Sequence, residues 1–137
     1  MSVTIEQALE FISGNSRTVL TTRRRDGSLQ MSPVNSGVWG GDIVISSRLP
    51  LAKVRNLRRN PSATVLVMTE QFYGRWVQVD GIAELIDQTR PGTVDLLVEV
   101  YRRIVGEHPD WDEYRAAMVA DQRVVIRIRP ERAVGEL

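Results

Sequence analysis

The stretch WVQVDGIAELI, Trp76–Ile86, is a long run with the alternation of apolar and polar residues that is typical of a β-strand. Its apolar residues fall on one face: Val77, Val79, Ala83 and Leu85. Gly81 interrupts the run, and a glycine inside a strand often marks a bulge or a bend at the corner of a barrel. We therefore expect this strand to serve both sides of a small, closed β-barrel.

Five further segments have strand character: residues 17–22, 29–39, 38–47, 62–69 and 123–137. Two of the connections carry turn signals, Asp26-Gly27 in the first hairpin and Gly40-Gly41 in the next. Because the strands follow one another across short turns, the sheet should be mainly antiparallel. With Trp76–Ile86, the count is six strands.

Four helices are expected around the strands: residues 4–14, 49–60, 90–106 and 110–120. Thr4 and Gln7 have the spacing of a capping box, Pro50 suits a first helical turn, and Asp110 is a candidate N-cap. No linker or repeat divides the chain. The sequence thus predicts one domain over residues 1–137, mainly β with helices.

Composition narrows the possible functions. The 137 residues are 42% hydrophobic and 26% charged, with a net charge of +1, which argues against duplex DNA or an anionic membrane as a bulk partner. There is no cysteine and one histidine, His108, so thiolate chemistry and a multi-histidine metal site are excluded. No acidic cluster has the spacing of metal ligands, and no signal or membrane-spanning run is present. A cytoplasmic location is the default expectation.

Lys53 is the only lysine among 18 basic residues. It lies in SSRLPLAKVRNLRRNP, Ser46–Pro61, where a strand leads into a short helix. Lys53 and Asn56 share one helix face, while Ser46 and Ser47 end the strand near the helix N-terminus, whose free N–H groups favour an anion. These groups form a plausible phosphate cradle; the alternative is a solvated lysine on a surface helix.

Five stretches, taken in order, resemble one known family: GNSRTVLTTRRRDGSLQMSPV, IVISSRLPLAKVRNLRRNPSATVLV, WVQVDGIAEL, YRRIVGEHPDWDEYRAAM and RVVIRIRPERAVG. They resemble the flavin and deazaflavin oxidoreductases of the pyridoxamine 5'-phosphate oxidase-like split-barrel superfamily. The likeness is greater to the branch that uses coenzyme F420, a deazaflavin, than to enzymes that oxidise pyridoxamine phosphate, with which it shares only the general barrel.

The resemblance implies a homodimer of six-stranded antiparallel split β-barrels, with two cofactor sites in clefts between the subunits. It places the cofactor phosphate near the segment that joins the third strand to the short helix, with Lys53 as a phosphate ligand. It places the ring along the second and third strands, with the partner subunit helping to close the pocket. The implied cofactor is coenzyme F420, and FMN is the alternative.

Candidate ring contacts follow from this placement. Gln30, Ser32 and Val34 share one face of their strand, where Ser32 or a backbone amide can bond the pyrimidine edge of the ring. Trp76 and Tyr73 are candidates to wall the ring or substrate pocket. Packing within the barrel or the subunit interface is the alternative interpretation for each of them.

Arginine clusters suggest where the rest of the cofactor lies. Coenzyme F420 carries a tail of glutamates beyond its phosphate, and a groove lined by Arg55, Arg59 and Arg23–Arg25 would suit such a tail. The alternative is a solvated basic face. His108 lies between two expected helices, where the resemblance indicates a structural role.

The primary functional hypothesis is an oxidoreductase that moves a hydride from reduced coenzyme F420 to an unsaturated small molecule. No catalytic residue or proton donor is assigned, because such a cofactor carries the chemistry and the protein orients it. The alternatives are an FMN-binding oxidoreductase of the same fold and a non-catalytic flavin or deazaflavin carrier. A barrel for single-stranded nucleic acid is disfavoured, since aromatics make up only 6% of the chain.

Overall fold

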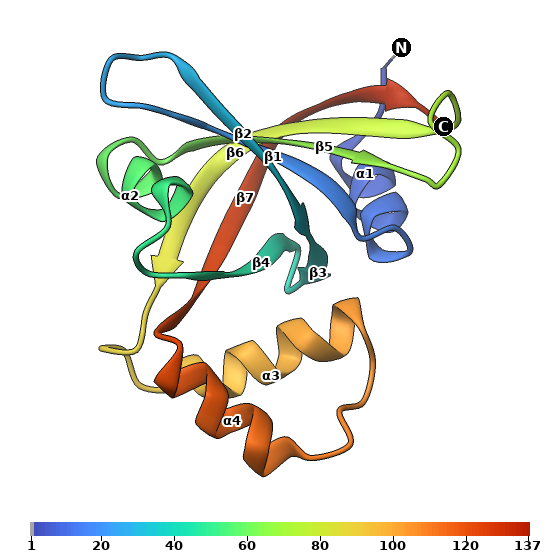
Figure 1. The fold of residues 1–137 in the computed structure, drawn as a ribbon. Helices are drawn as coiled ribbons and strands as arrows, with labels where there is room; N and C mark the ends of the chain where they lie inside the picture. The colour runs from blue at the N-terminus through green and yellow to red at the C-terminus, as the bar shows by residue number, and fades with distance from the viewer. Residues whose placement is uncertain (1) are drawn as a thin grey trace.

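The computed structural model describes residues 2–137, which form four helices and seven strands (Figure 1). In chain order the elements are α1 (Ile5–Ser13), β1 (Arg17–Arg23), β2 (Leu29–Asn35), β3 (Gly37–Trp39), β4 (Asp42–Arg48), α2 (Ala52–Arg59), β5 (Ser62–Met68), β6 (Trp76–Ile86), α3 (Thr93–Ile104), α4 (Trp111–Ala120) and β7 (Arg123–Glu136).

The strands form one antiparallel sheet in the order β2-β1-β5-β6-β7-β4-β3. The two edge strands, β2 and β3, are consecutive in the chain and are separated only by Ser36. A flat sheet cannot bring its two edges together, so this connection requires the sheet to curl into a half-barrel (Figure 1).

The strand count is seven, where the sequence predicted six. The segment expected as one strand over residues 29–39 divides at Ser36 because its two parts pair with different neighbours. Ser36 is buried at this corner, where its hydroxyl lies 2.6 Å from the Thr18 hydroxyl and its N–H donates to the Ser16 carbonyl. The corner thus ends the pairing with β1 and starts the pairing with β4.

The central strand behaves as its sequence predicted. β6 pairs with β5 along one edge and with β7 along the other, and its register with β7 shifts between Asp80 and Gly81. Val77, Val79 and Ala83 are buried, and Leu85 packs against the same core. The bulge turns the strand so that its two halves serve different parts of the curl.

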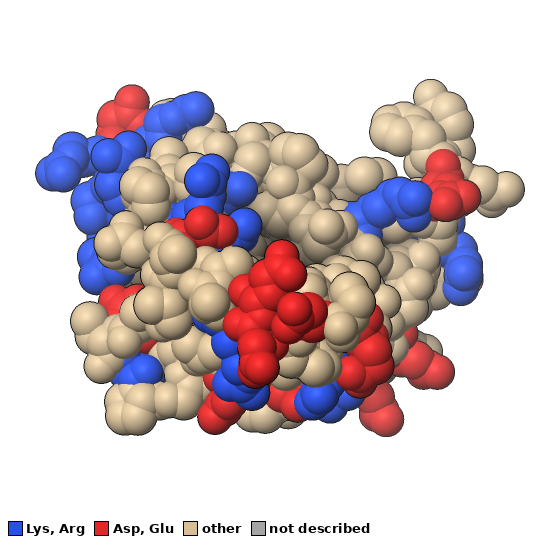
Figure 2. Space-filling model, turned by 60° about the horizontal axis from the view of Figure 1, so that its bottom comes forward, with Lys and Arg blue, Asp and Glu red and all other residues tan. Residues whose placement is uncertain are grey.

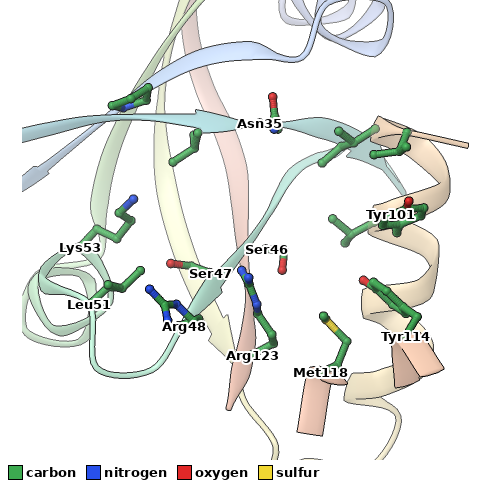
Figure 3. Close-up of a pocket in the computed structure, with 15 residues that line it drawn as sticks. Asn35, Ser46, Ser47, Arg48, Leu51, Lys53, Tyr101, Tyr114, Met118 and Arg123 are labelled. Atoms are coloured by element: carbon green, nitrogen blue, oxygen red, sulfur yellow. The ribbon is translucent and has the colours of Figure 1, made fainter. Parts of the chain in front are cut away.

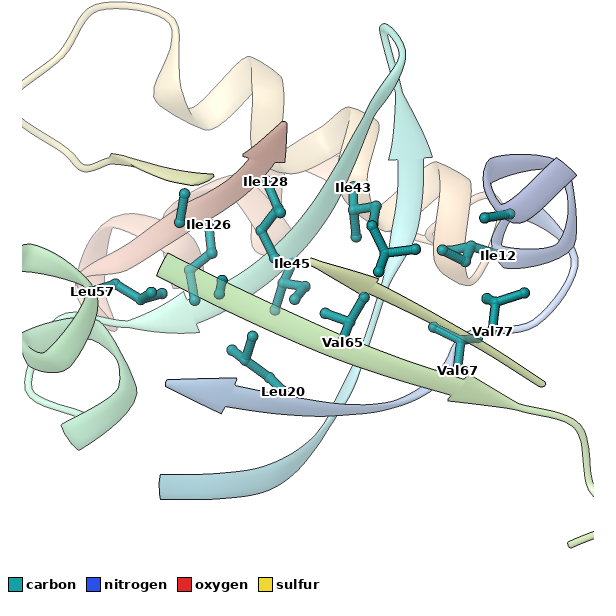
Figure 4. Packing of buried hydrophobic residues seen from close by; sticks show 14 of the residues in the cluster. Ile12, Leu20, Ile43, Ile45, Leu57, Val65, Val67, Val77, Ile126 and Ile128 are labelled. Carbon is teal, nitrogen blue, oxygen red and sulfur yellow. The ribbon is translucent and has the colours of Figure 1, made fainter. Parts of the chain in front are cut away.

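The inside of the curled sheet holds the larger hydrophobic core (Figure 4). Its fully buried members come from five strands and two helices: Ala8, Ile12, Leu20, Ile43, Ile45, Val54, Val65, Val67, Val77, Val79, Val124, Ile126 and Ile128. Helix α1 contributes Ile12 to this core, and helix α2 contributes Val54 and Leu57 from another side of it. The position of α2 is therefore fixed by burial on the barrel.

A second core lies on the other face of β4 and β7, under the α3–α4 helix pair. Because neighbouring residues of a strand point to opposite faces, Ile43 and Ile45 fill the barrel while Val44 packs against the helices. Tyr114 and Met118 on α4 complete this core, together with Leu97, Val98 and Val100 on α3. The helix pair thus covers one outer face of the sheet (Figure 1).

Most local signals are confirmed. Thr4 and Gln7 form the capping box, the Asp110 side chain accepts a bond from the Glu113 N–H, and Gly40 and Gly41 both have positive φ in their turn. Two helix starts are later than expected. Helix α2 begins at Ala52, with Pro50 in the preceding turn, and α3 begins at Thr93 after the left-handed Gly92.

Candidate functional site

The half-barrel is split between two free strand edges. β4 pairs with β7 from Ile43 to Arg48, but with β3 only from Asp42 to Val44, so its last residues have one open edge. β2 pairs with β1 along one edge and has no sheet partner among residues 2–137 on the other. Unpaired strand edges present backbone N–H and C=O groups to any ligand placed between them.

A cleft of about 490 Å³ lies at this split (Figure 3). Strands β2 and β4 line it together with the start of α2, the α3–α4 pair and the first residue of β7: Pro33, Val34, Asn35, Ser46, Ser47, Arg48, Leu51, Lys53, Val100, Tyr101, Ile104, Val105, Tyr114, Met118 and Arg123. Its volume is in the range of pockets that hold small molecules or cofactors.

The alternation of β4 divides the polar groups of the cleft into two sets. Ser47 follows the inward-facing Ile43 and Ile45, and it lies on the side where α2 packs and Lys53 is placed. Ser46 points to the opposite face, which α3 and α4 cover further along the strand. Arg123 precedes the inward-facing Val124 on β7, so its side chain belongs to this second set. The exposed Arg48 ends β4 between Leu51 and Arg123 (Figure 3).

The cleft is strongly cationic. Its 15 lining residues include Arg48, Lys53 and Arg123 but no aspartate or glutamate. Among residues 2–137, no carboxylate lies within 4.0 Å of any of these three cations, although most arginines elsewhere are paired. Burial lowers the pKa of the Lys53 ammonium, because removal of water disfavours its charged form. An anion in the cleft would restore this lost stabilisation.

Two buried polar atoms in the cleft have no hydrogen-bond partner among residues 2–137. They are the Ser47 hydroxyl, on a residue with 3% of its surface exposed, and the Arg123 Nε. Buried polar groups are nearly always satisfied in native proteins, so an orphan indicates a missing partner. The Ser47 hydroxyl belongs to the first set of polar groups, and the Arg123 Nε belongs to the second.

Helices α3 and α4 give the cleft an apolar wall, formed by Val100, Ile104, Val105 and Met118. Tyr114 joins this wall, and its hydroxyl donates to the Leu97 carbonyl at 2.9 Å. Burial raises the pKa of the Tyr114 hydroxyl. The cleft thus combines a cationic side with an apolar side that suits a flat, uncharged ring.

Four of the nine predicted site residues line the cleft: Val34, Ser46, Ser47 and Lys53. Gln30 and Ser32 share a half-buried face with Val34 on β2, as expected, but lie outside the lining. The Ser32 hydroxyl is buried without a partner, while the Gln30 carbonyl accepts a 3.4 Å bond from the Thr22 hydroxyl.

The other three predicted residues lie elsewhere. Asn56 is buried beneath α2, where its amide donates to the Thr22 hydroxyl at 3.1 Å and its carbonyl accepts from Arg59 at 2.7 Å. Arg55 is exposed on another face of the same helix. Trp76 pairs with Met68 and Glu136 where β6 begins, away from the split. Their roles in binding stay predictions.

His108 packs among aromatic rings in the loop between α3 and α4. Its ring centroid lies 5.2 Å from that of Tyr101 and 5.4 Å from that of Tyr114, and its Nδ1 accepts the Asp110 N–H. These contacts fit the structural role expected from the sequence. Among residues 2–137, no group of three acidic or histidine side chains could hold a metal ion.

Sequence reasoning did not single out Arg48 and Arg123 as site residues. Arg48 follows the two serines directly, and its place in the quoted Ser46–Pro61 stretch was a usable signal. Arg123 is 70 residues from Lys53, and only the pairing of β7 with β4 brings it to the cleft. No local pattern in the sequence shows that pairing.

Several of the other basic residues gather on a separate surface. Figure 2 shows lysine and arginine gathered at the end of the molecule that carries the β1–β2 hairpin and α2, while acidic residues gather on the face in front. Arg23, Arg24, Arg25 and Arg55 are exposed there and are not part of the cleft lining. A groove connecting them to Lys53 stays a prediction.

No helix within residues 2–137 combines the length and apolar character needed to cross a membrane.

Solved structures with this fold are similar along almost the whole chain. One is a conserved hypothetical protein from Mycobacterium tuberculosis, with 23% identity, a TM-score of 0.80, and coverage of 98% of this chain and 85% of that one. Another is described as an F420 reductase, with 21% identity, a TM-score of 0.69, and coverage of 91% and 94%. A third is General Stress Protein 26 from Bacillus anthracis, with 18% identity, a TM-score of 0.68, and coverage of 96% and 92%.

At these identities the structural matches establish the fold, which is the split barrel of pyridoxamine 5'-phosphate oxidase-like proteins. A sequence model of the family described as pyridoxamine 5'-phosphate oxidase matches residues 4–135. The chain belongs to this family, whose members bind flavins such as FMN and include oxidoreductases.

Proposed function

We propose that this protein is an oxidoreductase that binds coenzyme F420 in the cleft at the barrel split and passes a hydride to a small-molecule acceptor. The observation that carries the proposal is the pair formed by Lys53 and Ser47. Across residues 2–137, one is a half-buried ammonium without a carboxylate partner, and the other is a buried hydroxyl without a hydrogen bond. Both face a cleft large enough for a cofactor ring.

The residues of the cleft fit such a group. A phosphate supplies several acceptor oxygens, which match the Lys53 ammonium, the Ser47 hydroxyl and the N–H groups at the start of α2. That start has no side-chain cap, because the N-cap position is Leu51. A ring between the free edges of β2 and β4 would find backbone partners there, with Val34 on one side and the apolar wall on the other.

The chain's own residues would bind, orient and exclude water. Lys53 and Ser47 hold the phosphate end, and the α3–α4 wall removes water from the other side of the cleft. Reduced flavins and deazaflavins supply the hydride themselves, so the site needs no catalytic triad. Dense packing beneath α2 keeps Lys53 in place, since Val54 and Leu57 anchor the helix in the barrel core.

FMN is the second candidate cofactor, and family membership favours it. FMN ends at its phosphate, whereas coenzyme F420 continues into a glutamate tail. The exposed arginines at the end of α2 and in the β1–β2 hairpin offer charge complementarity to such a tail. Equal affinity for the coenzyme with and without its glutamates would remove this argument for F420.

We also propose that the working form is a homodimer. The outer face of β2, β1, β5 and β6 carries a hollow of about 350 Å³ lined in part by Leu29, Met31 and Leu66. Leu29 and Met31 are 48% and 59% exposed and lie two residues apart on the same face, and adjoining exposed apolar side chains can mark an interaction surface. A second copy that covers this face would bury them.

Titration of the purified chain with coenzyme F420 and with FMN tests the proposal. We expect the fluorescence of one cofactor to change on binding, with at least roughly tenfold weaker binding for Lys53→Gln. Arg115→Gln, whose side chain is paired with Asp95 on the α3–α4 surface, is the matched control. Binding of neither cofactor would refute the proposal.

Turnover separates an enzyme from a carrier. The reduced cofactor should lose its signal only when an acceptor is added, and the loss should depend on the protein. A chain that binds the cofactor but never accelerates this loss with a panel of unsaturated acceptors would instead be a carrier.

A further inference from the structure

Arg48 and Arg123 face each other across the β4–β7 pair. They are directly opposed in the register, so their side chains leave the same face of the sheet. Like charges in this position repel each other, and no carboxylate among residues 2–137 lies within 4.0 Å of either. By contrast, Arg127 on the same strand is bonded to Asp42 at 2.6 Å.

The Arg123 side chain is placed to bind an oxyanion. Its Nε is buried and has no hydrogen-bond partner within the described part of the chain, and the residue lines the cleft beside Ser46 and Arg48 (Figure 3). An arginine with a free Nε offers a fork of two parallel N–H donors, which matches a carboxylate or phosphate. The orphaned atom is thus a donor that lacks an acceptor.

This position is distinct from the one at Lys53. Ser47 lies on the side of β4 where Lys53 is placed, whereas Ser46 and Arg123 lie on the side of α3 and α4, and Arg48 ends β4 between Leu51 and Arg123 (Figure 3). The three cations of the lining give a formal charge of +3 with no acid to offset it. One phosphodiester, with a single negative charge, would leave two of them unpaired. An unpaired donor is costly where it is buried, as the Arg123 Nε is.

We propose that Arg48 and Arg123 form a second anion-binding position, which binds a carboxylate on the acceptor substrate while Lys53 and Ser47 hold the cofactor phosphate. The assignment to the acceptor rests on the function proposed above. The wall formed by Val100, Ile104 and Met118 receives the apolar part of the same molecule. The acceptor is therefore an amphiphilic acid, apolar at one end and carboxylated at the other.

A pair of isosteric probes tests the position without any cofactor. We expect the wild-type chain to bind 2-naphthoate at least tenfold more tightly than 2-naphthamide, which has the same shape but no charge. Arg123→Gln should reduce this preference to less than threefold, and Lys53→Gln should leave it in place. Arg129→Gln is the matched control, because Arg129 lies on the same face of β7 but is exposed and outside the cleft.

Separate titrations with coenzyme F420 and FMN complete the design. Arg123→Gln should change the affinity for the cofactor less than threefold, whereas Lys53→Gln should weaken it at least tenfold. Equal affinity of the wild type for the two naphthyl probes would overturn the inference. So would equal weakening of cofactor binding by the two substitutions, since the cations would then share one phosphate.

Folding of each variant is checked by its thermal unfolding. If Arg123→Gln does not fold, Arg48→Gln takes its place, because it leaves the packing of Arg123 intact. It should likewise reduce the preference for 2-naphthoate to less than threefold. A chain that prefers the naphthoate but binds neither cofactor would support the anion position and overturn the proposed function. The two failures are thus distinguishable.

Discussion

Gly81 on β6 and Arg129 on β7 approach so closely at the bulge that a Cβ atom on Gly81 would lie 2.3 Å from the Arg129 carbonyl oxygen. It would also lie 2.8 Å from the Cγ2 of the buried Ile128. The obstacle is backbone, which cannot move aside without loss of the β6–β7 pairing. The bend of the central strand therefore requires glycine at this position.

We predict that Gly81→Ala lowers the free energy of unfolding by about 2–3 kcal/mol, as overpacking in a rigid site does. Urea denaturation measures the change. Gly14→Ala is the control, since its φ is −104° and the nearest atom to an added Cβ is 3.9 Å away. Equal stability of the two variants would show that the bulge can relax.

Asn56 is expected to act on stability, because its side chain joins α2 to β1. Asn56→Ala leaves the Thr22 hydroxyl without its donor in a buried position, at a cost of about 1–3 kcal/mol. In this geometry the affinity of the folded variant for the proposed cofactor changes less than that of Lys53→Gln. A large loss of cofactor affinity at full stability would instead support the direct contact predicted from the sequence.

Lys53 should make the chain less stable near neutral pH than an apolar residue would. Burial lowers the pKa of Lys53 below the value of 10.5 expected in the unfolded chain. Between the two pKa values the unfolded state binds more protons, so stability rises with pH in that window. We therefore predict that Lys53→Met melts at or above the wild-type temperature at pH 7.

The comparison across pH identifies the cause. The difference in melting temperature between Lys53→Met and the wild type should shrink as the pH approaches 10.5, because Lys53 then becomes neutral in both states. Inorganic phosphate should raise the melting temperature of the wild type more than that of the variant. A pH-independent difference would indicate that packing, and not charge, is responsible.

Local features of the fold were predictable from the sequence, because each depends on residues close together in the chain. The Thr4 capping box, the Gly40-Gly41 turn and the bulge at Gly81 are of this kind. The break of the strand at Ser36 was not predictable from the sequence. It arises because β2 pairs with β1 whereas β3 pairs with β4.

The candidate site shows the same difference between residues that are close in the chain and residues that long-range pairing brings together. Ser46, Ser47 and Lys53 come from one short stretch and were found together, as a strand end and a helix start must be adjacent. Arg123 reaches the cleft through a strand pairing that spans 70 residues from Lys53. Helical spacing places Asn56 on the Lys53 side of α2 but does not show that the Thr22 hydroxyl lies against it. Long-range pairing and burial are decided by the whole fold.

The proposed homodimer would cover the outer face of β2 and β5. Met31 and Leu29 lie on this face, and a glutamate at position 31 would be desolvated without a partner on assembly. We predict that Met31→Glu raises the dimer dissociation constant by roughly 100-fold, because an unpaired buried charge costs several kcal/mol.

Val119→Glu is the control, since Val119 is 55% exposed on α4, away from this face. Sedimentation velocity over a concentration series measures both. If Met31→Glu and the wild type sediment alike as dimers while Val119→Glu dissociates, the subunits meet through the helices and not through the sheet.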